Sequence, residues 1–146
     1  MQVVITNRQK LVRMARARIT RAVREACRAG RWSARSLSVV LVGASEMQRI
    51  NREFLGHDYV TDVLAFPFEG GDPAGEVVVC PRFAREQARR RRHPTTEELL
   101  LYVVHGTLHL AGFRDKKPAD IRRMRAAERK ALARLGIERD LWRERS

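Results

Sequence analysis

The 146-residue sequence has few cysteines, few acidic residues and no long apolar run. Its two cysteines, Cys27 and Cys80, lie far apart and form no CxxC or other ligand-like spacing, which favours buried thiols over a disulfide. Reduced thiols fit a cytoplasmic setting. The longest stretch without a charged residue, 99–113, is too short to span a bilayer. This excludes a transmembrane helix, and we expect no membrane partner.

The scarcity of acidic residues leaves the chain strongly basic. Seventeen aspartates and glutamates stand against 30 lysines and arginines, so the net charge is +13 at pH 7. A protein with this excess of positive charge finds most of its partners among polyanions, and nucleic acid is the first expectation.

Hydrophobic patterning predicts one α+β domain over residues 1–146, with a small mixed sheet of about four strands packed by about five helices. Strands are predicted at 37–42, 63–66 and 76–80, after a short apolar start at 3–5. Helices are predicted to begin at Asn7, at a Ser45/Gln48 capping box, at Pro81, at a Thr95/Glu98 capping box and at Pro118.

Two histidines stand four residues apart in the segment 105–115, followed by a glycine and an aspartate. On an α-helix this spacing places His105 and His109 on one face, where both imidazoles can bind one ion from adjacent turns. Gly112 can adopt the left-handed conformation that ends a helix, which lets Asp115 turn back toward the histidines. Two nitrogens and one oxygen suit Zn²⁺, and three protein ligands leave a fourth position for water, as in catalytic zinc sites.

The segment that carries the histidines is apolar nearly all round, because no charged residue occurs between Leu99 and Ala111. Such a helix is expected to be buried. Buried imidazoles need partners, and a metal ion would satisfy them. The alternative is a pair of core histidines hydrogen bonded to backbone or carboxylate groups. The sequence favours the metal site on a buried helix, a zincin-like arrangement.

Three separated segments together resemble the YbeY family: 61–67 (Thr-Asp-Val-Leu-Ala-Phe-Pro), 75–80 (Gly-Glu-Val-Val-Val-Cys) and the histidine segment 105–115. The resemblance runs from about residue 38 to 136. It implies a metal-dependent single-strand endoribonuclease that processes small-subunit rRNA ends and acts in ribosome quality control. The partners it implies are an rRNA precursor and the small ribosomal subunit, with ribosomal proteins or an assembly GTPase as further candidates.

Two positions depart from the pattern of that family. Its commonest metal segment ends in a third histidine preceded by aspartate, whereas this chain has Arg114 and Asp115 at these places. Asp115 therefore takes the third ligand position, and its negative charge should make the bound metal a weaker Lewis acid. Leu55 stands where many members carry an arginine with a catalytic or RNA-positioning role, so this chain lacks that arginine.

The histidine spacing is also similar to that of HExxH metalloproteases, in which the glutamate after the first histidine polarises the zinc-bound water. Gly106 occupies that position here and offers no base, which argues against protease chemistry. Non-haem Fe(II) oxygenases also use two histidines and a carboxylate, but rarely take both histidines from one helix. The working hypothesis is RNA phosphodiester cleavage with Zn²⁺ held by His105, His109 and Asp115. The alternative is a non-catalytic rRNA-binding assembly factor with a structural metal.

Arginines are the candidate contacts to RNA phosphates. The densest run is Arg89, Arg90, Arg91 and Arg92, for which the alternative is favourable charge at a helix C-terminus. The basic faces of the first and last predicted helices add Arg13, Arg16, Arg24, Arg122, Arg125 and Arg129. Asp62 is expected either to support a metal histidine or to satisfy a turn. His57 and His93 are expected at the surface.

Overall fold

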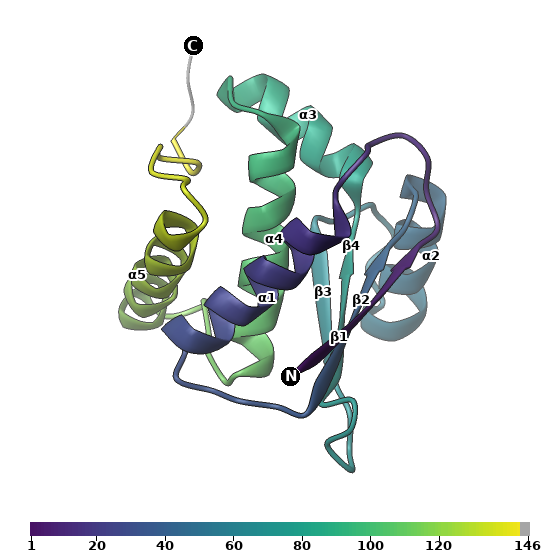
Figure 1. The fold of residues 1–146 in the computed structure, drawn as a ribbon. Helices are drawn as coiled ribbons and strands as arrows, with labels where there is room; N and C mark the ends of the chain where they lie inside the picture. Colours follow the sequence, from purple (N-terminus) through teal and green to yellow (C-terminus); the bar gives the residue numbers. More distant parts are fainter. Residues whose placement is uncertain (144–146) are drawn as a thin grey trace.

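The computed structural model describes residues 1–143. Within them the helices are α1 (Arg16–Ala29), α2 (Ala44–Leu55), α3 (Pro81–Arg91), α4 (Thr95–Leu110) and α5 (Pro118–Arg134). The strands are β1 (Gln2–Asn7), β2 (Ser36–Leu41), β3 (Val63–Pro67) and β4 (Gly75–Val79) (Figure 1). The predicted α+β class is confirmed. No helix between residues 1 and 143 combines the length and the apolar character needed to cross a membrane.

The four strands form one sheet in the order β1-β2-β4-β3. Strands β1, β2 and β4 run parallel, whereas β3 runs antiparallel to β4 at one edge, so the sheet is mixed as predicted. Strand β2 lies in the interior of the sheet and is buried along nearly its whole length. Its almost continuous apolar run, 37–41, fits a strand whose two faces are both covered.

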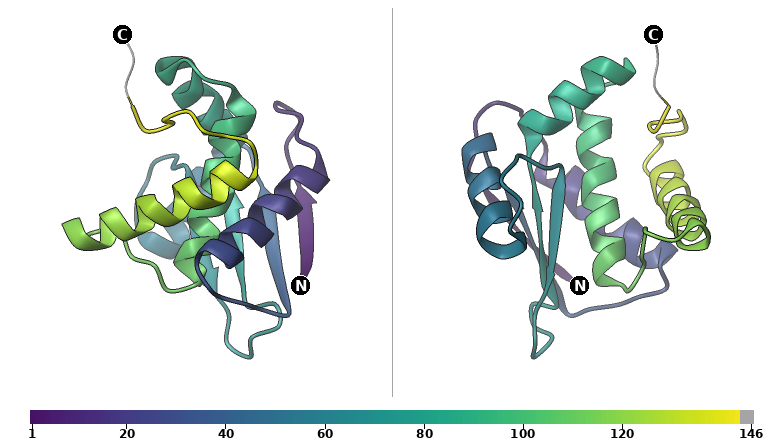
Figure 2. Two further views of the ribbon diagram at one scale, coloured as in Figure 1. Left: turned by 60° about the vertical axis from the view of Figure 1, so that its left-hand side comes forward. Right: turned by 180° about the vertical axis from the view of Figure 1, so that it is seen from behind.

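The helices cover the two faces of the sheet unequally. Helix α2 lies alone on one face, and α1, α4 and α5 lie on the other, which the view from behind in Figure 2 shows. Helix α4 contacts β3, β4, α1, α3 and α5, so it is the centre of the larger helical layer. The larger cluster of buried apolar side chains surrounds α4, and a smaller one lies under α2.

A glycine lets α4 lie close to the sheet. A Cβ at Gly106 would lie 2.5 Å from Cγ1 of Val77 and 3.0 Å from Cγ2 of Val63, so no side chain fits without displacing β3 and β4. Gly106 stands directly after His105 and three residues before His109. The depth at which both histidines sit above the sheet is therefore set by this contact.

The N-terminal segment differs from the prediction. The helix expected to begin at Asn7 begins only at Arg16, and residues 2–7 form the edge strand β1. Asn7 pairs with Leu41 of β2 as the last residue of β1, so it cannot begin the expected helix. Asn7 caps a turn and not a helix, because its Oδ1 accepts hydrogen bonds from the backbone and side-chain amides of Gln9.

The two predicted capping boxes do not form. Helix α2 begins after Gly43 and α4 begins after Pro94, without a side-chain cap at either start. Glu98 is instead fully buried and accepts a 2.6 Å hydrogen bond from Nε2 of His93. The expectation of a surface position for His93 is wrong, because Glu98 gives its imidazole a buried partner.

Cys27 and Cys80 are buried free thiols, as predicted. Burial raises the pKa of Cys27 to about 11 and also raises the pKa of Cys80. Both side chains therefore stay protonated near neutral pH and act as small apolar groups in the core.

Candidate metal centre

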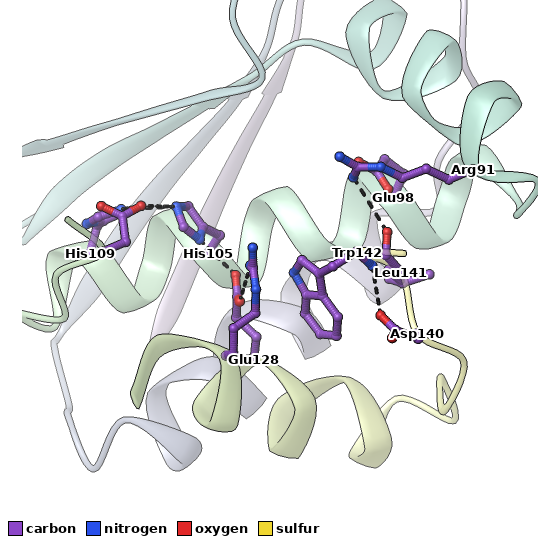
Figure 3. A network of polar contacts seen from close by, with 10 residues as sticks. Arg91, Glu98, His105, His109, Glu128, Asp140, Leu141 and Trp142 are labelled. Carbon is purple, nitrogen blue, oxygen red and sulfur yellow. Dashed lines mark hydrogen bonds and ion pairs between the residues drawn. The ribbon is translucent and has the colours of Figure 1, made fainter. Parts of the chain in front are cut away.

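His105 and His109 lie on successive turns of α4 and point to the same side of the helix (Figure 3). Their Nε2 atoms are 3.0 Å apart. Oδ2 of Asp115 lies 3.3 Å from Nε2 of His105 and 3.2 Å from Nε2 of His109. The structure thus brings the three predicted ligand side chains together, with one ligand atom of each within 4.8 Å of the others.

Asp115 reaches the histidines through the turn that ends α4. Gly112 has a φ of +102°, a backbone conformation that residues with a side chain rarely adopt. Its N–H donates to the carbonyl of His109, and the N–H of Phe113 donates to the carbonyl of Leu108. The side chain of Phe113 packs against the larger core and anchors the turn. The left-handed glycine predicted from the sequence is confirmed.

Glu128 of α5 is a further member of the site, and sequence reasoning missed it. Its carboxylate is fully buried and accepts a 2.7 Å hydrogen bond from Nδ1 of His105. The other carboxylate oxygen accepts a 3.0 Å hydrogen bond from Arg125. Only its place in the sequence could have indicated this role. Glu128 stands midway between the buried residues Met124 and Leu132 on the apolar stripe of α5. A carboxylate on a buried stripe needs a specific partner.

The hydrogen bond to Glu128 fixes the tautomer of His105. A neutral ring that donates from Nδ1 carries its lone pair on Nε2, and this lone pair faces His109 and the carboxylate of Asp115. Electron pairs that converge in this way repel one another unless a proton or a metal ion lies between them. Ligand atoms at the usual bond lengths of a tetrahedral zinc lie about 3.4 Å apart, near the distances seen here. The donor set therefore fits a zinc ion.

The charges around His105 favour a cation at this point. Burial disfavours the charged ring and by itself lowers the pKa of His105. The hydrogen bond with Glu128 and the negative charges of Glu128, Asp115 and Asp62 outweigh burial, so the pKa is raised above its ordinary value. In the metal-free protein a proton and a metal ion therefore compete for the same imidazole.

A pocket of about 360 Å³ opens beside the ligands, between α3, α4 and α5. We call it the metal pocket. His105, Asp115, Arg91 and Trp142 are among its lining residues, and Figure 3 shows Arg91 and Trp142 on the side of His105 away from His109. His105 and Asp115 keep 19% and 38% of their side-chain surface exposed, so solvent reaches the ligands.

Asp62 also lines the metal pocket. Its Oδ1 accepts a 2.7 Å hydrogen bond from the backbone N–H of Val63, so it satisfies the turn before β3, one of the two roles expected for it. His57 is exposed as predicted, and its ring stacks on Tyr59 with centroids 5.4 Å apart. Leu55 is the last residue of α2, and its side chain is also exposed.

The four consecutive arginines do not share one surface. Arg89, Arg90 and Arg91 form the last turn of α3, and Arg92 follows it with a φ of +57°. Arg89, Arg90 and Arg92 are exposed. Arg91 instead turns inward, 3.3 Å from the carboxylate of Glu98, and lines the metal pocket. Contact of these arginines with RNA stays a prediction.

The protein is thus an α+β protein with a candidate three-ligand metal centre. Two of the ligands are histidines on a buried helix, and the third is an aspartate that the following turn brings back to them. The sequence model of the family "Endoribonuclease YbeY" matches residues 4–136 of the chain. The chain belongs to this family, and the resemblance seen in its sequence is confirmed.

Individual proteins agree with this assignment. The chain is 43% identical over 129 residues to endoribonuclease YbeY of Rhodopirellula baltica. This match covers 86% of this chain and 64% of the relative. It is 37% identical over 136 residues to endoribonuclease YbeY of Chlorobium luteolum. This match covers 92% of this chain and 97% of the relative. The solution structure of TM1509 from Thermotoga maritima is similar with a TM-score of 0.63 and 26% identity, over 92% of both chains.

The relatives differ in length from this chain. It spans just under two thirds of the proteins from Rhodopirellula baltica and Bordetella pertussis, 64% and 66% of their lengths.

Proposed function

We propose that this protein is a zinc-dependent endoribonuclease that cleaves single-stranded RNA during small-subunit rRNA maturation and acts in ribosome quality control. The observation that carries the proposal is the convergence of His105, His109 and Asp115 beside a pocket that His105 and Asp115 line. Family membership supports RNA as the substrate class, because the relatives are named endoribonucleases. The net charge of +13 also favours a polyanionic substrate.

His105, His109 and Asp115 would hold the metal. When bound, zinc supplies Lewis-acid stabilisation of a phosphoryl oxygen and lowers the pKa of water. With only three protein ligands, the site keeps a side open to the metal pocket for water and substrate. Asp115 adds a negative charge that a third histidine would not bring.

The remaining residues of the site position the ligands and the strand. Glu128 accepts the Nδ1 proton of His105 and so keeps the Nε2 lone pair directed at the site. Arg125 holds the second oxygen of Glu128 and lines the metal pocket together with Arg91. Their positive charges lie where phosphates on either side of the cleaved bond would pass, and such contacts orient a strand without reading its sequence.

The proposed partners are an rRNA precursor and the small ribosomal subunit, and ribosomal proteins or an assembly GTPase are further candidates. Arg89, Arg90, Arg91 and Arg92 are proposed contacts to RNA. A substrate of this kind would place the protein in the cytoplasm.

A second candidate function is an rRNA-binding assembly factor in which the metal is structural. Leu55 favours it, because an exposed leucine cannot take the catalytic or positioning role of the arginine that many family members carry there. An ion at the three ligands would then tie α4 to the turn after it and, through Glu128, support the packing of α5.

Cleavage and binding assays separate the two functions. Purified protein is incubated with single-stranded and structured RNA, with and without a chelator, and compared with His109→Ala and with His57→Ala, an exposed histidine outside the site. The endoribonuclease proposal expects cleavage that the chelator and His109→Ala abolish and His57→Ala leaves intact. RNA binding without cleavage, at the same affinity in all three proteins, supports the assembly factor.

A further inference from the structure

A second pocket lies at the end of the sheet where the parallel strands finish. It has a volume of about 500 Å³ and is lined by the segment after β1, the segment after β2 and the first turns of α3, which follows β4. Four of its lining residues are cationic, Arg8, Lys10, Arg82 and Arg85, and none is acidic. We call it the basic pocket. Ligands of sheets with parallel strands commonly bind outside the carboxyl ends of the strands.

Two of the four cations are neutralised by neighbours. Arg8 forms an ion pair with Glu46 at 2.7 Å, and Arg82 lies 3.5 Å from Glu86. Lys10 and Arg85 have no carboxylate within ion-pair distance among residues 1–143. The basic pocket therefore keeps two positive charges that no part of the described chain compensates.

Arg85 gives the stronger indication of a ligand. Its side chain is half-buried, and its Nε is fully buried without a hydrogen-bond acceptor in the part of the chain that the structure describes. A guanidinium that loses water and gains no acceptor is unfavourable, because its charge and its N–H groups both remain uncompensated. An anion in the basic pocket would supply what is missing.

An intermediate pocket of about 510 Å³ borders both the basic pocket and the metal pocket. It shares Ala44 and Arg82 with the basic pocket and Phe83 with the metal pocket. The three pockets thus form a row from the metal ligands to Arg85. The half-buried ring of Phe83 stands where the row passes from one pocket to the next, and such a ring offers a face on which a base can stack.

We propose that Arg85 and Lys10 bind a phosphodiester group of the same RNA strand that is cleaved at the metal centre, some nucleotides away from the cleaved bond. This inference rests on the proposed function, because it takes single-stranded RNA as the substrate. The strand runs from the metal pocket past Phe83 to the basic pocket. Free inorganic phosphate has the same chemistry, so the test must separate the two sources.

The test measures how much of the RNA affinity depends on salt. Fluorescence anisotropy gives the affinity of the zinc-loaded protein for labelled single-stranded RNAs of about 4 and about 16 nucleotides, the range of single-strand site sizes. The affinity is followed over a series of salt concentrations, from readings taken before a gel detects any cleavage of the RNA. The double variant Lys10→Gln/Arg85→Gln is compared with Arg35→Gln/Lys130→Gln, which removes the same charge at two exposed positions outside the three pockets.

The double variant is expected to bind the longer RNA about tenfold more weakly than wild type does, and the control to bind it nearly as well as wild type. The slope of log affinity against log salt should become shallower by about 0.7 for each RNA phosphate that the variant no longer neutralises. If Arg85→Gln unfolds the protein, Lys10→Gln alone changes an exposed residue and should still lower the slope.

Three results would overturn the inference. If the double variant keeps the slope and affinity of wild type while wild type binds RNA, the basic pocket is not on the path of the strand and the proposed function still stands. If wild type binds neither RNA, the proposed function itself fails. If phosphate raises the melting temperature of wild type but not of the double variant at equal ionic strength, and RNA binding is the same for both, the pocket takes a free anion.

Discussion

Replacing Glu128 by glutamine is expected to weaken zinc binding by about 10- to 100-fold, the usual effect of losing a carboxylate that supports a metal-bound histidine. Glutamine has nearly the shape of glutamate, so the packing of this fully buried side chain is kept. The chemistry changes, because the carboxylate accepts hydrogen bonds from both His105 and Arg125, at 2.7 and 3.0 Å. An amide has only one acceptor oxygen, so it can accept from His105 or from Arg125. Its NH₂ group then faces the other donor and forms no hydrogen bond with it.

The expected loss corresponds to about 1.4–2.7 kcal/mol of binding free energy. Two changes contribute to it. His105 is no longer held in the tautomer that presents its Nε2 lone pair, and the negative charge that makes its ring a stronger donor is gone. The pKa of His105 should fall in the variant for the same reason, because the hydrogen bond and charge of Glu128 are what raise it against burial.

A competition titration against a chromophoric chelator at fixed pH measures the zinc affinity of wild type and Glu128→Gln. Glu138→Gln is the matched control, since Glu138 is exposed and lies outside the metal pocket. Circular dichroism shows whether the variant is folded. A folded Glu128→Gln protein with the zinc affinity of wild type would falsify the role assigned to the His105–Glu128 hydrogen bond.

Four further predictions concern the same region. Gly106→Ala should destabilise the protein by about 1–3 kcal/mol in urea denaturation, because its methyl group would meet Val77 at 2.5 Å, whereas Gly43→Ala, with no atom near its Cβ, should cost far less. Glu98→Ala should cost about 3 kcal/mol, because it leaves buried His93 without its hydrogen-bond partner and removes the 3.3 Å ion pair with Arg91, and equal stability of Glu98→Ala and of Glu69→Ala in an exposed loop would contradict this. In thermal melts of the metal-free protein, the stabilisation that His105 provides should be complete below the unfolded pKa of about 6.5 and be lost as pH rises through its raised folded pKa. Zinc affinity should follow the opposite course and fall as pH drops through the same window, since the metal needs the neutral ring, and affinity unchanged down to pH 5 would contradict histidine ligation.

The sequence predicts those parts of the site that depend on neighbours along the chain. His105, His109 and Asp115 lie within one helix and the turn after it, so helical periodicity and one glycine are enough to bring them together. Glu128 contacts His105 only because α5 packs against α4, and no local sequence pattern predicts that contact. It is visible in the sequence only as a charge on an apolar stripe.

The same distinction explains the errors in the fold. The helix expected from Asn7 begins only at Arg16, because Asn7 still pairs with Leu41 of β2 at the end of β1, and that pairing is not a local property. Thr95 and Glu98 have the spacing of a capping box, but Glu98 faces the interior and binds His93 instead. Local hydrogen-bonding patterns therefore predict helix starts poorly wherever a polar side chain has a buried partner.

Trp142 gives the protein an internal spectroscopic probe. The guanidinium groups of Arg125 and Arg129 lie 5.0 and 4.9 Å from the centre of its ring, and Arg125 is bonded to the carboxylate that holds His105. A change of charge at His105 is thus only two side chains away from the indole. Trp32, the second tryptophan, packs against the larger core and does not line the metal pocket. Tryptophan fluorescence can therefore follow metal binding at the site without any label. The Trp142→Phe variant gives the background emission of Trp32.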